Sequence, residues 1–221
     1  MRYFVDKDSI VRQIWGKADT VLFIFAGASA EFALNKAVDW LYFTGRLPED
    51  PLGRLFSTVV YARRIIFSKY EDALYAIGQI TRIHQEVEAS RGAQIPQWAY
   101  RDVLFLLIDY SIRSFEVLER DLSDTEKAEV FDTFYRVGQH MGITDLPLNY
   151  PQWIIMREQH LNQNLSCSKF TINLYWQYRK HLGFIRYILL KQVQILIVPK
   201  RVKQLLKLNT TPFIKPILWL Y

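Results

Sequence analysis

A single histidine occupies the apolar stripe of a long predicted helix. Ile77, Ile80, His84 and Val87 are spaced three, four and three residues apart, so they share one helix face. An imidazole in this position is often a core side chain that hydrogen-bonds to a neighbour. It also suits the axial ligand of a haem iron, which needs one neutral imidazole in an apolar slot between helices. The spacing alone leaves both interpretations open.

The helix expected just before this histidine carries a polar stripe. Arg54, Thr58 and Tyr61 lie at positions i, i+4 and i+7, which puts a guanidinium, a hydroxyl and a phenol on one face. Such groups can hold the propionates of a haem or bond to oxygen near its iron. A solvated helix face has the same pattern, so the stripe also fits a purely structural role. The opposite face is apolar and can pack on the body of the protein (Leu55, Val59, Ala62, Ile66).

Other signatures of chemistry are missing from the sequence. It contains no P-loop, no Gly-x-Gly-x-x-Gly, no Gly-x-Ser-x-Gly and no His-Glu-x-x-His motif. A di-iron site would need Glu-x-x-His on two helices, and the carboxylates near His84 and His160 have other spacings. Asp109 and Tyr110 follow directly after the apolar run of the most apolar helix. We expect Asp109 to face a polar edge or to meet an arginine, with a catalytic role as the alternative.

Helical periodicity runs through the whole chain, so we predict an all-α protein. The expected form is a single multi-helix globular domain with a haem pocket between helices and a basic helical C-terminal segment. We divide it into a body, residues 1–165, and an extension, residues 166–221. Helices are expected at about 7–17, 19–34, 36–44, 51–68, 70–89, 97–120, 124–141, 150–164, 170–180, 183–196 and 199–208. The clearest boundary is the capping box that begins at Ser123 and includes Glu126.

The formal charge of +6 is distributed unevenly along the 221 residues. Residues 159–221 hold ten Lys and Arg and no Asp or Glu, while the preceding part is slightly acidic. This distribution excludes a uniformly basic surface for nucleic acid. The C-terminal segment combines apolar residues with these cations. We therefore expect this segment either to bind an anionic membrane surface or to complete the core with its exposed sides basic.

Cys167 is the only cysteine, which excludes an intrachain disulfide. The sequence shows no signal peptide and no apolar stretch of transmembrane length. These features predict a cytoplasmic protein that is either soluble or attached peripherally to a membrane surface.

Several segments together resemble the catalytic domain of MpaB-type oxygenases and rubber oxygenases (latex-clearing proteins). The resemblance extends from about Asp19 to Trp153, and residues 198–202 are similar to a downstream element of the family. It rests on the order and spacing of Pro51-Leu52-Gly53-Arg54-Leu55-Phe56-Ser57-Thr58, Ile83-His84-Gln85-Glu86-Val87, Leu122-Ser123-x-x-Glu126, Val137-Gly138-x-x-Met141-Gly142 and Leu146-Pro147.

The resemblance implies an all-helical domain that binds haem b and uses dioxygen to cleave carbon–carbon double bonds of isoprenoid chains. His84 would be the proximal iron ligand, with Arg54 and Thr58 near the haem, and we add Tyr61 and Tyr110 as further cofactor contacts. Rubber-cleaving members carry a lysine where this chain has Ser57, so a small apolar substrate fits better than rubber. A haem- or lipid-binding protein without turnover, at the membrane surface, is the alternative.

Overall fold

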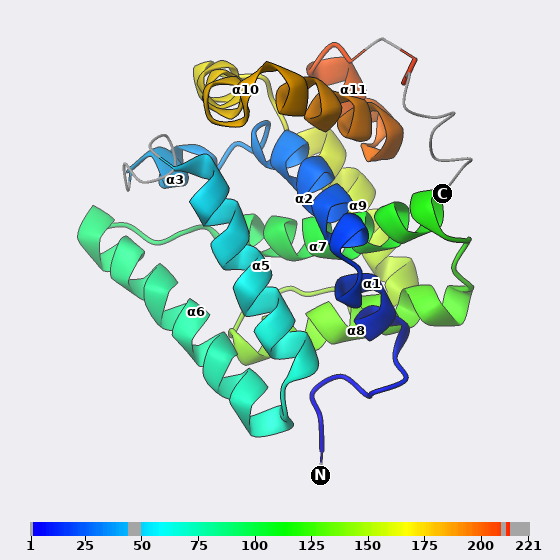
Figure 1. Cartoon of the computed structure of the whole chain (residues 1–221). Coiled ribbons are helices and arrows are strands. Elements are labelled where there is room, and N and C mark those ends of the chain that lie inside the picture. Colours follow the sequence, from blue (N-terminus) through cyan, green and yellow to red (C-terminus); the bar gives the residue numbers. More distant parts are fainter. Residues whose placement is uncertain (1, 44–49, 209–210, 213–221) are drawn as a thin grey trace.

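The computed structural model describes residues 2–43, 50–208 and 211–212. Within these ranges the regular elements are α-helices, accompanied by two isolated β-bridges (Figure 1). The prediction of an all-α single domain is confirmed. In chain order the helices are α1 (Ile10–Gly16), α2 (Ala18–Phe32), α3 (Asp39–Phe43), α5 (Pro51–Phe67), α6 (Tyr70–Arg91), α7 (Gln97–Leu118), α8 (Asp124–His140), α9 (Tyr150–Gln163), α10 (Lys169–Ile197) and α11 (Lys200–Leu205).

Local signals set most of these boundaries. Ser123 and Glu126 form the predicted capping box at the start of α8. Gly92 ends α6 in the left-handed conformation, with φ at 66°. The first helix begins later than predicted because the Ser9 hydroxyl accepts from the Val11 amide and caps it there. The segments expected at 170–180 and 183–196 form one element, α10, which bends at Gly183 (φ 72°, ψ 175°).

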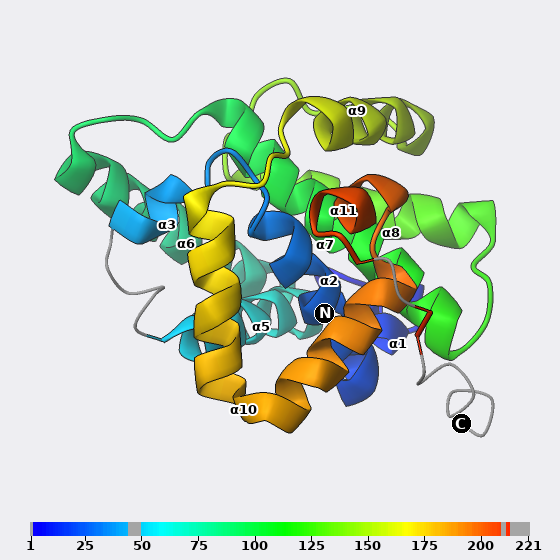
Figure 2. The same ribbon diagram turned by 90° about the horizontal axis from the view of Figure 1, so that it is seen from above.

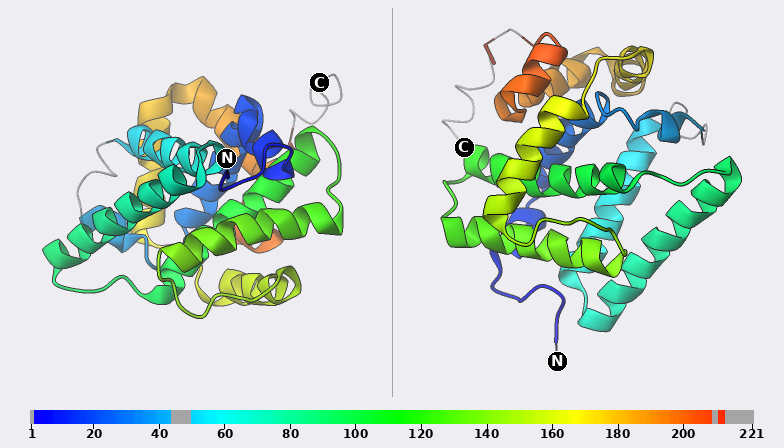
Figure 3. Two further views of the ribbon diagram at one scale, coloured as in Figure 1. Left: turned by 90° about the horizontal axis from the view of Figure 1, so that it is seen from below. Right: turned by 180° about the vertical axis from the view of Figure 1, so that it is seen from behind.

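The most apolar helix, α7, is central as its sequence predicts. In Figure 1, α2 passes in front of α7, and seen from behind, α9 passes across α7 and α8 (Figure 3). The approach of α2 to α7 is close because Gly27 has no side chain. A Cβ built there would lie 2.2 Å from Cδ1 of Tyr110, so the tyrosine ring occupies the space that a larger residue would need.

The C-terminal segment packs against the body through one side of its helices. Ile195, Ile197 and Val202 belong to the main core, and Tyr187 and Leu190 pack on a second, smaller cluster. The bend of α10 lies at an outer corner of the molecule (Figure 2). The side of α10 that faces outward there is not used by the core. In the described part of the chain, no helix has both the length and the apolar content that crossing a bilayer requires.

Candidate functional site

His84 lies in the second half of α6, and its side chain is half-buried. Its Nδ1 is 2.8 Å from the carbonyl oxygen of Ile80, one turn earlier in the same helix. Because a carbonyl oxygen can only accept, the ring proton of a neutral imidazole sits on Nδ1 and the lone pair on Nε2. Backbone carbonyls fix the tautomer of metal-binding histidines in the same way. The imidazole is therefore held in the form that a metal ligand requires.

A small cavity of about 120 Å³ lies beside this imidazole. Tyr100 of α7 forms one wall, with its ring centroid 5.2 Å from that of His84. The Tyr100 hydroxyl donates to Glu88 Oε1 at 3.1 Å, and the same oxygen accepts from the Ile95 amide at 2.8 Å. Glu88 thus joins α6 to α7 next to the cavity. The other residues that line it are Thr81, Gln85, Gln97, Met141, Gly142 and Ile143.

The three predicted residues of α5 lie on the helix that pairs with α6. The two helices run antiparallel and diverge from a short shared turn (Figure 1). Arg54 lies thirteen residues before the end of α5, and His84 lies fourteen residues after the start of α6, so both are about equally far from that turn. Thr58 is exposed and Tyr61 is half-buried. The side chain of Arg54 lies outside the described part of the structure.

Tyr110, the remaining predicted contact, lies apart from His84. It follows Tyr100 by ten residues in α7, which corresponds to about 15 Å along the helix axis. Its side chain is fully buried, and its hydroxyl donates to Glu31 Oε2 at 2.8 Å. The structure therefore places His84 and the α5 residues on one pair of helices and assigns Tyr110 to a different group of residues.

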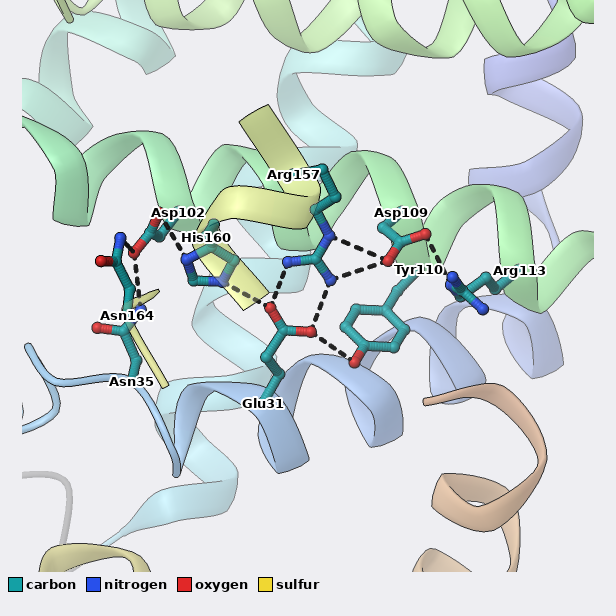
Figure 4. Close-up of polar contacts among 9 residues, drawn as sticks. All are labelled: Glu31, Asn35, Asp102, Asp109, Tyr110, Arg113, Arg157, His160 and Asn164. Carbon is teal, nitrogen blue, oxygen red and sulfur yellow. Dashed lines mark hydrogen bonds and ion pairs between the residues drawn. The ribbon is translucent and has the colours of Figure 1, made fainter. Parts of the chain in front are cut away.

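That second group is a buried charge cluster between α2, α7 and α9 (Figure 4). Arg157 lies at its centre, with 4% of its surface exposed. Both of its terminal nitrogens bond to the carboxylate of Glu31, with Nη2 at 2.6 Å from Oε2. The same guanidinium donates to Asp109 Oδ2 from Nη2 at 2.8 Å and from Nε at 3.1 Å. Arg113 donates to the other oxygen of Asp109 at 2.7 Å.

His160 extends the cluster toward the start of α7. Its Nε2 lies 2.8 Å from Glu31 Oε1, and its Nδ1 lies 2.8 Å from Asp102 Oδ1. Asp102 also accepts from the side-chain amides of Asn35 at 3.1 Å and Asn164 at 3.0 Å. When His160 is protonated, the three carboxylates of the cluster are balanced by two guanidiniums and one imidazolium.

The electrostatics of the cluster favour its charged form. Burial by itself would raise the pKa of the Glu31 carboxyl, but Arg157 and His160 outweigh it and lower the pKa to about 2. Burial would lower the pKa of His160, and its bonds to Asp102 and Glu31 reverse this and raise the pKa. Burial, followed by the charge of Glu31, raises the pKa of Tyr110 well above its ordinary value. A carboxylate this acidic is a weak base, so the cluster is suited to holding helices together.

The expectation that Asp109 meets an arginine is confirmed, twice over, by Arg113 and Arg157. The other members of the cluster were missed by the sequence reasoning. A signal for them exists, because polar residues recur at helical spacing within three buried stretches of sequence: α7, α9, and the end of α2 with the turn that follows it. The pairs are Glu31 and Asn35, Asp102 and Asp109, and Arg157 and His160.

Within the described ranges, no three His, Cys, Asp or Glu side chains gather as metal ligands. A single axial histidine does not require such a group.

The fold and the site together define the class of protein. It is an all-helical domain in which the imidazole of His84, with its lone pair on Nε2, lies at the contact between α6 and α7. A sequence model of the family described as the ER-bound oxygenase mpaB/B'/rubber oxygenase catalytic domain matches residues 13–213. The chain belongs to this family of oxygenase catalytic domains. A comparison with curated proteins found no match.

Proposed function

We propose that this protein is a haem b-dependent oxygenase that uses dioxygen on an apolar substrate, isoprenoid-like or lipid. The observation that carries the proposal is the state of His84. Its proton is directed to the Ile80 carbonyl, which leaves the lone pair on Nε2, and it lies beside a cavity between helices. Membership in an oxygenase family supports the same conclusion.

The residues beside the cavity fit haem by their chemistry, whereas the cavity is small. His84 presents the Nε2 lone pair that an iron ligand donates, because its ring proton lies on Nδ1. Pockets for cofactors usually measure about 300–1,000 Å³, compared with about 120 Å³ here. Binding therefore requires α6 to move away from α7. The hydrogen bond between Tyr100 and Glu88 crosses this contact and is the one that we expect to open.

Each of the chain's own residues then has a defined task. His84 would hold the iron through Nε2, and the Ile80 carbonyl keeps the ring in that orientation. Arg54 and Thr58 would donate hydrogen bonds to a propionate or to dioxygen, with Tyr61 one turn further along the same face. Haem, when bound, supplies the redox chemistry that couples dioxygen to the substrate.

The proposed substrate class rests on membership in the family and on one sequence difference from its rubber-cleaving members. Ser57 occupies the position at which rubber-cleaving members carry a lysine, so we propose a small apolar molecule with carbon–carbon double bonds. Such a molecule dissolves in membranes, and we propose a membrane surface as the place where the protein meets it.

Oxygen consumption tests the proposal. The haem-loaded protein should consume dioxygen with squalene, an isoprenoid with several double bonds, and should release carbonyl products. Squalane, its saturated analogue, is the matched control and should give no uptake. Haem binding without oxygen consumption across a panel of unsaturated lipids would contradict the oxygenase and favour the binding protein.

Variants locate the activity within the chain. His84→Gln should abolish both haem binding and uptake, whereas His140→Gln alters an exposed histidine of α8 and should preserve them. Thr58→Val keeps the shape of the side chain and removes its hydroxyl. We expect it to lower kcat by about 10- to 100-fold, the usual effect of losing a polar group that stabilises a transition state. Unchanged kcat in Thr58→Val would remove this residue from the mechanism.

A further inference from the structure

The bend of α10 lies at an outer corner of the molecule (Figure 2), and large apolar side chains beside the bend are exposed. Phe184 and Ile185 follow Gly183 directly, and 66% and 73% of their surfaces are exposed. Leu189, one turn after Ile185, is also exposed. A soluble surface seldom places consecutive residues of this size in water without a partner.

These side chains are not needed for the packing of α10. In the helix that follows the bend, Tyr187 and Leu190 point inward and join the smaller core cluster. Ile185 and Leu189 lie on the opposite side of the same turns, because residues four apart share a face. The exposed group is therefore an outward face that remains after the core is complete.

The charge around this face is entirely positive along α10. Arg179, Lys180 and Arg186 are exposed on either side of the bend, and residues 159–221 contain no Asp or Glu. Trp176 is exposed one turn before Lys180, and the ammonium of Lys180 lies 5.4 Å from its ring. Tryptophan and tyrosine favour the boundary between lipid headgroups and hydrocarbon, where one part of the ring is apolar and the other is hydrated.

We infer that this surface, the α10 corner (Trp176, Lys180, Phe184, Ile185, Arg186 and Leu189), docks the protein onto an anionic lipid bilayer. The apolar side chains enter the interface while the cations meet negatively charged headgroups. A second copy of the chain is a poorer occupant, because a symmetric contact would bring the same cations face to face. This inference is independent of haem and of turnover.

Sedimentation of the full-length protein with vesicles tests it. Binding should be strong to vesicles of phosphatidylcholine with phosphatidylserine, weak to phosphatidylcholine alone, and reduced by salt. Lys180→Gln with Arg186→Gln should weaken binding to the anionic vesicles by about thirtyfold. Phe184→Ser with Ile185→Ser should weaken it by at least about tenfold. Removing residues 183–221 is unsuitable as a test, because Ile195, Ile197 and Val202 belong to the core.

Matched controls distinguish an effect of the α10 corner from the effect of changing net charge or exposed apolar surface elsewhere on the protein. Lys7→Gln with Lys69→Gln makes the same change in net charge near the starts of α1 and α6, at the opposite end of the molecule from α10 (Figure 1). Leu148→Ser removes an equally exposed apolar residue from a loop. Both controls should bind as the wild type does. The inference is overturned if wild-type protein stays in the supernatant, if corner variants bind as well as the controls, or if the corner instead forms a dimer that these variants dissolve.

Discussion

The buried charge cluster makes the stability of this fold depend on pH in two opposite ways. The folded-state pKa of Glu31 is about 2, below its ordinary value of 4.5. Its contribution is therefore fully present above pH 4.5 and is lost as the pH falls toward 2. A shift of this size corresponds to about 3 kcal/mol of unfolding free energy. The folded-state pKa of His160 is raised above 6.5, so its contribution is present below pH 6.5 and is lost as the pH rises through the folded value.

Together the two groups predict that the cluster contributes most between about pH 4.5 and pH 6.5. Glu31→Gln should cost about 3–5 kcal/mol in this window, because it leaves Arg157 buried with one carboxylate partner. This is a large part of the roughly 5–15 kcal/mol that stabilises an ordinary domain. The difference between wild type and variant should shrink by about 3 kcal/mol as the pH is lowered from 5 to 2.

Urea denaturation followed by far-ultraviolet circular dichroism, repeated from pH 2 to pH 9, measures the loss of unfolding free energy at both low and high pH. His160→Gln should remove the decline of stability above pH 6.5, whereas His140→Gln, which changes an exposed histidine, should keep it. A Glu31→Gln variant that loses less than about 1 kcal/mol at pH 5.5 would refute the reasoning. An equal decrease in unfolding free energy from pH 5 to pH 2 in the wild type and the variant would also refute it.

Three further predictions concern other parts of the fold. Gly27→Ala should lower the unfolding free energy by about 1–3 kcal/mol, because its Cβ would overlap the Tyr110 ring, and a thermal melt checks this. Ser123→Ala removes the hydroxyl that accepts from the Glu126 amide and should cost about 1 kcal/mol in urea denaturation. Ser90→Ala, which changes an exposed serine in the last turn of α6, is the comparison, and equal stability of the two variants would contradict the prediction. Tyr100→Phe removes the hydrogen bond to Glu88 that holds α6 to α7 and that we expect to open when haem binds. The variant should therefore bind haem about fivefold more tightly in a titration. Weaker binding would show that this contact need not open.

The helices could be predicted from the sequence because their signals are local. Ser123 and Glu126 are three residues apart, and Gly92 ends α6 through its own backbone conformation. The apolar run in α7 likewise implies burial on most sides. Such features depend on neighbours within a turn or two and need no knowledge of the tertiary packing.

The charge cluster could not be assembled in this way. Glu31 and Arg157 are 126 residues apart in sequence, and only the crossing of α2, α7 and α9 brings them together. Tyr110 was misplaced for the same reason. It was expected beside the cofactor, whereas its hydroxyl donates to Glu31 in the charge cluster, although the need of its neighbour Asp109 for an arginine was recognised. Helical periodicity shows that these residues are buried, but which helices meet there is a property of the whole fold.

The C-terminal segment divides its apolar residues between the core and the exposed surface within a single helix. Its sequence allowed either a membrane-binding surface or a completion of the core. The structure places Ile195 and Tyr187 in core clusters and leaves Phe184 and Ile185 exposed. The one apolar segment therefore divides between two environments, a distinction that composition cannot make.

The visible absorption spectrum of the purified protein, titrated with haem, tests the central claim most directly. We predict a Soret band that saturates at one haem per chain in the wild type and in His140→Gln. The band should be lost in His84→Ala and restored by added imidazole, because the vacated space beside Tyr100 can admit the free ligand. An unchanged Soret band in His84→Ala, or no saturable band in the wild type, would contradict His84 as the axial ligand.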